Sequence, residues 1–238
     1  MRKSYEYEVS RLKKYRIMIF IYAFLTQLLS LYFFTIIGRF DNTDENSVLR
    51  NYTTLSGLAT TICMCILVVY GTVVINRFLV TNYIGENKTR LYLYPVGRSQ
   101  LFYTKVTSFC GTFFLFQFLG ITLSNAFYLI SETFSPILLT SELVYRHLPQ
   151  FMTISLAGVI LTISIILLSS VAGIHLNSTL ATIVTGIIFV VICGNILAMA
   201  LASHLVITLS ATILVIIITY IFIKITGTRI ENDEVISK

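Results

Sequence analysis

The side chains that could carry catalysis or hold a metal are few and scattered along this sequence of 238 residues. His175 and His204 lie at opposite ends of one predicted helix and His147 in a predicted loop, so we expect no two histidines to share a metal or a proton. All four cysteines lie in apolar runs, where a thiol is usually a packing residue: Cys63, Cys65, Cys110 and Cys193. The sequence has neither a phosphate-binding Gly-x-x-x-x-Gly-Lys-Ser/Thr motif nor partners for a nucleophile. We therefore expect no catalytic residue, metal or cofactor in this chain.

The segment Arg77 to Lys105 is instead the one internal loop whose sequence indicates a defined structure, and it holds five of the seventeen basic residues and one of the three prolines. Gly85 is expected to end the extension of the second apolar run beyond the membrane. A short helix is expected from Glu86 to Tyr94. Pro95 stops that helix, and Arg98 begins the next. The pattern predicts a rigid knob. Its tyrosines fit either a protein contact or a loop lying on lipid headgroups, and both interpretations stay open.

The elements that must position this segment are apolar helices. Hydrophobic residues make up 56% of the chain and charged residues 12%, with a mean hydropathy of +0.84, which is typical of an integral membrane protein. Six runs without Asp, Glu, Lys or Arg are long enough to span a bilayer. They are Ile17 to Ile37, Thr53 to Asn76, Val106 to Ile130, Phe151 to Gly173, Ser178 to Leu197 and Leu205 to Ile223. We predict an all-α integral membrane protein with a six-helix transmembrane domain over residues 17–225 and a tail over residues 226–238.

The basic residues predict the orientation of these helices. All but three of the seventeen lie before the first span, in the segment 77–105 or in the tail; the exceptions are Arg39, Arg50 and Arg146. The positive-inside rule then places both termini and the segment 77–105 in the cytoplasm. The net charge of +6 is explained by topology, and no nucleic-acid partner is expected.

The leader, residues 1–16, carries Tyr5, Val9 and Leu12 at helical spacing among charged residues. This pattern fits an amphipathic helix lying on the cytoplasmic membrane surface, where its basic residues attract anionic lipid. A disordered basic leader that only sets topology is the alternative, and the sequence leaves both open.

The predicted spans lack the buried charges that ion-coupled transporters use, which argues against a secondary transporter. Their most polar side chains are amides, which in membranes more often join helices than bind substrates. These amides are Gln27, Gln117, Asn125 and Asn195.

One segment resembles a known family. Its pattern is an acidic residue, a leucine-rich turn, Tyr-Pro-x-x-Arg, and a lysine seven residues after the arginine. The residues are Glu86, Leu91, Leu93, Tyr94, Pro95, Val96, Arg98, Leu101 and Lys105. The pattern is similar to that of permease subunits of type-2 ATP-binding-cassette exporters, especially short six-span members from Gram-positive bacteria. Lys88 and Thr89 replace a frequent Gly-Thr, and the short connection between the fifth and sixth spans leaves little room for the family's outer re-entrant helices.

The resemblance implies a coupling helix that docks on a separate cytoplasmic ATPase subunit, which binds the ATP. The implied interface is Glu86, Arg90, Leu91, Tyr92, Tyr94, Pro95, Arg98 and Lys105. It also implies an elbow helix in the leader, a homodimer or a heterodimer with a second permease, a bacterial plasma membrane, and export of an amphipathic cargo such as an antimicrobial peptide or a lipid. The alternative is a non-transporting scaffold or sensor that recruits a partner through the segment 77–105.

Overall fold

A computed structural model describes residues 2–40, 52–92, 97–135, 137, 148–203 and 205–232. Every element over these residues is a helix, so the all-α prediction is confirmed there. The elements are α1 (Arg2–Arg11), α2 (Lys13–Phe40), α3 (Tyr52–Phe78), η2 (Val80–Tyr83), α4 (Glu86–Tyr92), α5 (Arg98–Phe134), α6 (Leu148–His175), α7 (Thr179–Ser203) and α8 (Leu205–Glu231).

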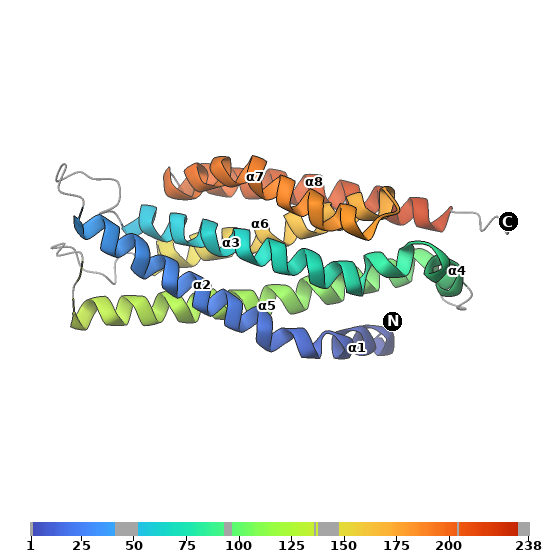
Figure 1. Cartoon of the computed structure of the whole chain (residues 1–238), viewed down its shortest axis with the longest axis horizontal. Helices are drawn as coiled ribbons and strands as arrows, with labels where there is room; N and C mark the ends of the chain where they lie inside the picture. The colour runs from blue at the N-terminus through green and yellow to red at the C-terminus, as the bar shows by residue number, and fades with distance from the viewer. Residues whose placement is uncertain are drawn as a thin grey trace.

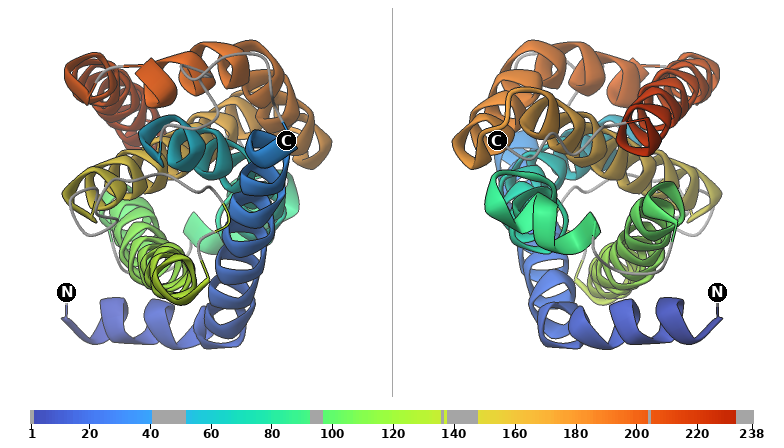
Figure 2. Two further views of the ribbon diagram at one scale, coloured as in Figure 1. Left: turned by 90° about the vertical axis from the view of Figure 1, so that its left-hand side faces the viewer. Right: turned by 90° about the vertical axis from the view of Figure 1, so that its right-hand side faces the viewer.

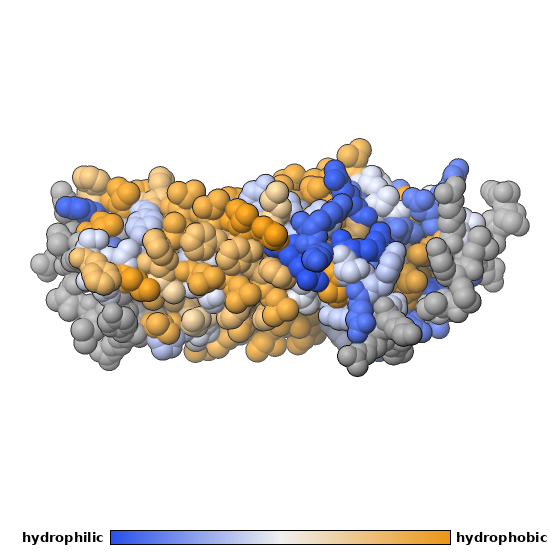
Figure 3. Space-filling view, turned by 90° about the horizontal axis from the view of Figure 1, so that it is seen from below, coloured by the Kyte–Doolittle hydropathy of each residue, from blue (hydrophilic) through white to orange (hydrophobic). Residues whose placement is uncertain are grey.

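The long helices run side by side along the molecule, whereas α1 lies across its axis (Figures 1 and 2). Over the described residues, five helices are long and apolar enough to cross a membrane: α2, α3, α5, α6 and α8. This is compatible with a multi-pass membrane protein, and Figure 3 shows apolar side chains over most of one face. The apolar stretch recognised in α7, Thr179–Ile192, is shorter, so a sixth span stays a prediction.

The helices at the centre of the bundle are α3 and α6. In the most apolar stretch of each, 61% and 72% of the residues are buried, against 17% in α8. Small residues allow the close crossings, as they do in many membrane proteins. A Cβ added to Gly120 of α5 would lie 2.7 Å from the Cβ of Ala23 and 2.9 Å from the carbonyl oxygen of Phe20 in α2. Because only 17% of its most apolar stretch is buried, α8 leaves most of its apolar surface available to lipid or protein.

Of the four amide side chains expected to join helices, three do so. Gln27 Nε2 donates to Asn125 Oδ1 (3.0 Å), and Asn125 Nδ2 donates to Ser155 Oγ (2.7 Å), which links α2, α5 and α6. Gln117 Nε2 of α5 donates to Thr162 Oγ1 of α6 (3.0 Å). The predicted packing role is confirmed for these three residues; the side chain of Asn195 lies outside the described part.

Several helices extend beyond the predicted apolar runs. The α2 helix begins at Lys13, four residues before the predicted span, and α5 runs from Arg98 to Phe134. The hydrogen-bonded backbone continues into the polar ends, where hydropathy gives no signal. The predicted break around residues 173–178 is confirmed: α6 ends at His175, and Asn177 adopts a left-handed conformation with φ 49°.

The helices α1 and α4 and the last turn of α8 lie at one end of the bundle (Figure 1). We call this the basic end, because it carries Arg11, Lys88, Lys105 and Arg229. The charge pattern predicted that these segments share one side. That this side is the cytoplasm stays a prediction.

Candidate functional site

The connection from α3 to α4 is built by short-range hydrogen bonds. The side chain of Asn82 donates to the carbonyl oxygen of Phe78 (2.6 Å), and Asn87 of α4 donates back to the carbonyl oxygen of Thr81 (3.2 Å). Gly85 has φ +59°, a left-handed conformation that favours glycine, and this residue ends the connection as predicted. The helix α4 is therefore fixed relative to the end of α3.

The same connection is anchored in the protein interior. Val80 and Tyr83 of η2 are buried, and the ring of Tyr83 meets the edge of Phe102 in α5 at a centroid distance of 5.6 Å. The segment η2 therefore links the connection to both α3 and α5, which are two of the candidate membrane spans.

A buried ion pair fastens α1 to α5. Lys105 Nζ lies 2.9 Å from Glu8 Oε1, and the two side chains are only 3% and 7% exposed. Lys105 Nζ also lies 5.0 Å from the ring centre of Phe78, and Arg11 Cζ lies 5.8 Å from the same ring. We call Glu8, Arg11, Phe78 and Lys105 the ion-pair cluster. The cluster joins α1, α3 and α5. Within it, the pair of Glu8 and Lys105 is desolvated.

A cleft of about 470 Å³ separates α1 from α4. Its lining combines charged and amide groups with two leucines: Ser4, Tyr7, Glu8, Arg11, Asn82, Asn87, Leu91, Leu101 and Lys105. We call it the α1–α4 cleft. A lining that combines charged and amide groups with leucines suits the side chains of a protein partner.

The predicted interface residues fall into three groups. Glu86 is exposed at the start of α4, where a carboxylate is favoured by the helix dipole, and Arg98 is half-buried at the start of α5. Leu91 lines the α1–α4 cleft, as does Lys105, whose ammonium is held by Glu8. Arg90 and Tyr92 lie in α4, but the structure does not describe their side chains. Tyr94 and Pro95 lie outside the described residues.

The main contributions that sequence reasoning missed come from α1. The predicted leader helix is confirmed over Arg2–Arg11, and Leu12 after it is buried. However, Glu8 was not predicted to pair with Lys105. The available signal was an acidic residue in a mostly basic leader, together with a lysine at the boundary of an apolar run.

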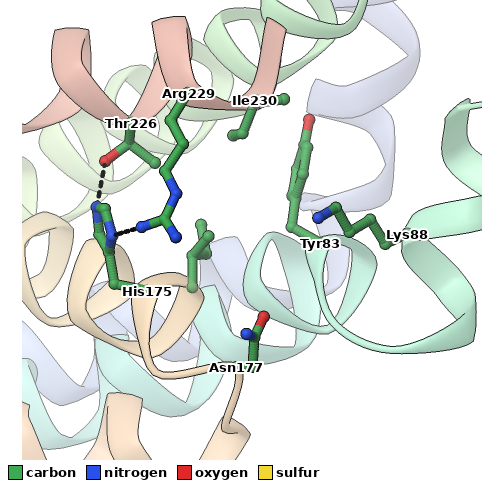
Figure 4. Close-up of a pocket in the computed structure, with 8 residues that line it drawn as sticks. Tyr83, Lys88, His175, Asn177, Thr226, Arg229 and Ile230 are labelled. Atoms are coloured by element: carbon green, nitrogen blue, oxygen red, sulfur yellow. Dashed lines mark hydrogen bonds between the residues drawn. The ribbon is translucent and has the colours of Figure 1, made fainter. Parts of the chain in front are cut away.

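A second cavity at the basic end, of about 230 Å³, lies between the connection from α3 to α4, the turn from α6 to α7, and α8 (Figure 4). We call it the basic pocket. The guanidinium of Arg229 donates to His175 Nδ1, so the neutral imidazole carries its proton on Nε2, which lies 3.3 Å from Thr226 Oγ1. The predicted lone interfacial histidine thus has partners on α8.

Neither cavity carries the constellation that catalysis would require. Within the described residues, no group of three His, Cys, Asp or Glu side chains could hold a metal, and Cys63, Cys65 and Cys110 are free thiols. Catalytic inactivity of this chain stays a prediction.

The chain matches no family model, no curated protein and no solved structure. The role of the basic end is therefore argued from its geometry and from the resemblance of the segment from Glu86 to Lys105.

Proposed function

We propose that this chain is the permease subunit of an ATP-driven exporter and that a separate ATPase subunit docks at the α1–α4 cleft. The observation that carries the proposal is the placement of α4. It is a short helix, fixed to the end of α3 by hydrogen bonds and followed by the start of α5, beside a cleft of about 470 Å³. A partner that moved α4 would move both long helices.

The proposed coupling is a rigid-body movement and needs no reactive side chain. ATP-driven closure of the partner displaces α4, and η2 transmits the displacement through Tyr83 to Phe102. Rigid attachment favours this mechanism because a flexible loop would absorb the displacement.

The cargo, the assembly and the location follow from the resemblance. The cargo is amphipathic, a peptide or a lipid-like molecule, and the charge-free apolar runs suit such a substrate better than a small ion. The permease works as a homodimer or as a heterodimer with a second permease in the bacterial plasma membrane, with both termini in the cytoplasm. The partner subunit binds the ATP.

The proposal is tested by a double substitution in the docking segment, Pro95→Ala with Arg98→Glu. It removes a helix stop and reverses one charge, so we expect normal insertion but loss of ATP-dependent transport. The assay measures movement of a fluorescent phospholipid and a fluorescent amphipathic peptide in vesicles that contain the protein and its co-purified ATPase. Phe134→Ala is the control, because Phe134 is 86% exposed in α5, far along that helix from the basic end.

Full transport by the double variant would contradict docking of the ATPase through the segment from Glu86 to Lys105. Purification of the wild-type chain gives an independent result. A stoichiometric ATPase supports the exporter, whereas a non-ATPase partner alone contradicts it and favours the scaffold or sensor.

A further inference from the structure

The basic pocket presents two cationic side chains toward one space. The Lys88 ammonium and the Arg229 guanidinium face the pocket from opposite sides, on α4 and α8 (Figure 4). Among the described residues that line it, none is acidic: Tyr83, Lys88, Ile174, His175, Asn177, Thr226, Arg229 and Ile230. Glu86 and Glu231 are close in sequence, but both are exposed and neither lines the pocket. The lining selects for an anion.

His175 on α6 holds the guanidinium of Arg229 without neutralising its charge. His175 accepts a hydrogen bond from Arg229 through Nδ1, which requires the imidazole to be uncharged at that nitrogen. A guanidinium has five N–H donors, and this contact uses one nitrogen, Nη1. Arg229 is therefore oriented by His175 while it retains its charge and further donors.

The surroundings of the pocket are those of a membrane interface. Leu176 and Leu180, on either side of Asn177 in the turn from α6 to α7, are 63% and 72% exposed. On α8, Phe222 and Ile225 precede Thr226 and are also exposed. Exposed apolar side chains close in sequence to the residues of a cationic pocket fit a ligand with a charged head and apolar chains better than a small soluble anion.

We propose that the basic pocket binds the phosphate of an anionic phospholipid headgroup, with Arg229 and Lys88 as the charged contacts. The acyl chains then lie along the exposed leucines at the start of α7. The lipid joins α8 to α4 and to the turn from α6 to α7. This site does not depend on the proposed export function, since it requires only that the basic end lies at a membrane surface.

The test compares retention of phosphatidylglycerol and phosphatidylcholine with identical acyl chains on the full-length chain in detergent, measured by native mass spectrometry. The variants are Arg229→Gln and Lys88→Gln, which keep hydrogen-bonding groups but remove charge. The matched control is Lys224→Gln, an exposed cation on the same helix outside the pocket. Removing one pocket cation should weaken phosphatidylglycerol binding about fivefold, and the control should change it less than about twofold.

Each result decides the proposal. Selective retention of phosphatidylglycerol, lost in either pocket variant and kept in the control, supports it. If Arg229→Gln does not give a monodisperse protein, Lys88→Gln on the short helix α4 carries the test. Equal retention of the two lipids, or equal loss in the control, overturns it. Displacement of phosphatidylglycerol by a small excess of inorganic phosphate would also overturn it, by showing that the site takes free phosphate.

Discussion

The ion-pair cluster at the basic end and the amide cluster inside the bundle, which consists of Gln27, Thr60, Asn125 and Ser155, both bury polar side chains between helices. They differ in charge and in access to water. The amide cluster is neutral, and its members lie between α2, α3, α5 and α6. The pair Glu8 and Lys105 is charged and lines the α1–α4 cleft.

This difference indicates which part of the molecule can rearrange. Separated amides deep among apolar helices would find few new partners, so that cluster holds one arrangement. Separated charges beside a cleft can be hydrated, which lowers the cost of moving α1 relative to α5. We expect a partner-driven movement to use the basic end and to leave the helix crossings at the amides intact.

The largest effect should come from breaking the ion pair. Glu8→Ala leaves the Lys105 ammonium buried without its carboxylate, and we expect the free energy of unfolding to fall by about 3 kcal/mol. Detergent-denaturation curves measure it. Glu86→Ala, which removes an exposed carboxylate from the same end, is the control and should lose less than about 1 kcal/mol. Glu8→Leu combined with Lys105→Met should recover most of the loss. A fall below about 1 kcal/mol would show that the pair is already hydrated.

A smaller effect is expected in the amide cluster. Asn125→Leu removes the acceptor for Gln27 and the donor to Ser155, and hydrogen bonds between membrane helices contribute modestly, so unfolding should become easier by about 1 kcal/mol. The same denaturation assay measures it. If Asn125→Leu were more damaging than Glu8→Ala, the ranking of the two clusters would be reversed.

The smallest effect should come from a single hydroxyl contact near the other end of the bundle. Thr35 Oγ1 lies 2.9 Å from the hydroxyl of Tyr128, which joins α2 and α5. Thr35→Val keeps the shape but removes the oxygen, with an expected loss of about 0.6 kcal/mol. Thr107→Val removes a hydroxyl that bonds only within its own helix and serves as the control. Equal stability of the two variants would show that this contact between helices contributes nothing.

Much of the fold could be predicted because it depends on local patterns. Apolar runs predict helices, Gly85 has the left-handed conformation that the predicted break requires, and Arg98 begins α5 as expected. Other helix ends could not be read, since α2 begins at Lys13 and so extends into polar sequence.

The site could be predicted only in part, because its contacts join distant residues. The segment with Leu91 was recognised as a contact surface, and Leu91 does line a cleft. The pairing of Glu8 with Lys105 and of His175 with Arg229 depends on how α1 and α8 pack, which no local spacing encodes. Lys105 was expected at the partner interface, and this stays a prediction; its ammonium is held by Glu8, which the sequence did not predict.

The most direct test of the central claim places a photo-crosslinking amino acid at Tyr7, which lines the α1–α4 cleft and is 63% exposed. The same probe at Phe134, on the far part of α5, is the matched control. In cells that express the chain at its native level, we predict that the Tyr7 probe forms an adduct with a nucleotide-binding ATPase subunit and that the Phe134 probe does not. An ATPase adduct from both positions, or adducts at Tyr7 that contain no ATPase, would contradict docking of an ATPase at the α1–α4 cleft.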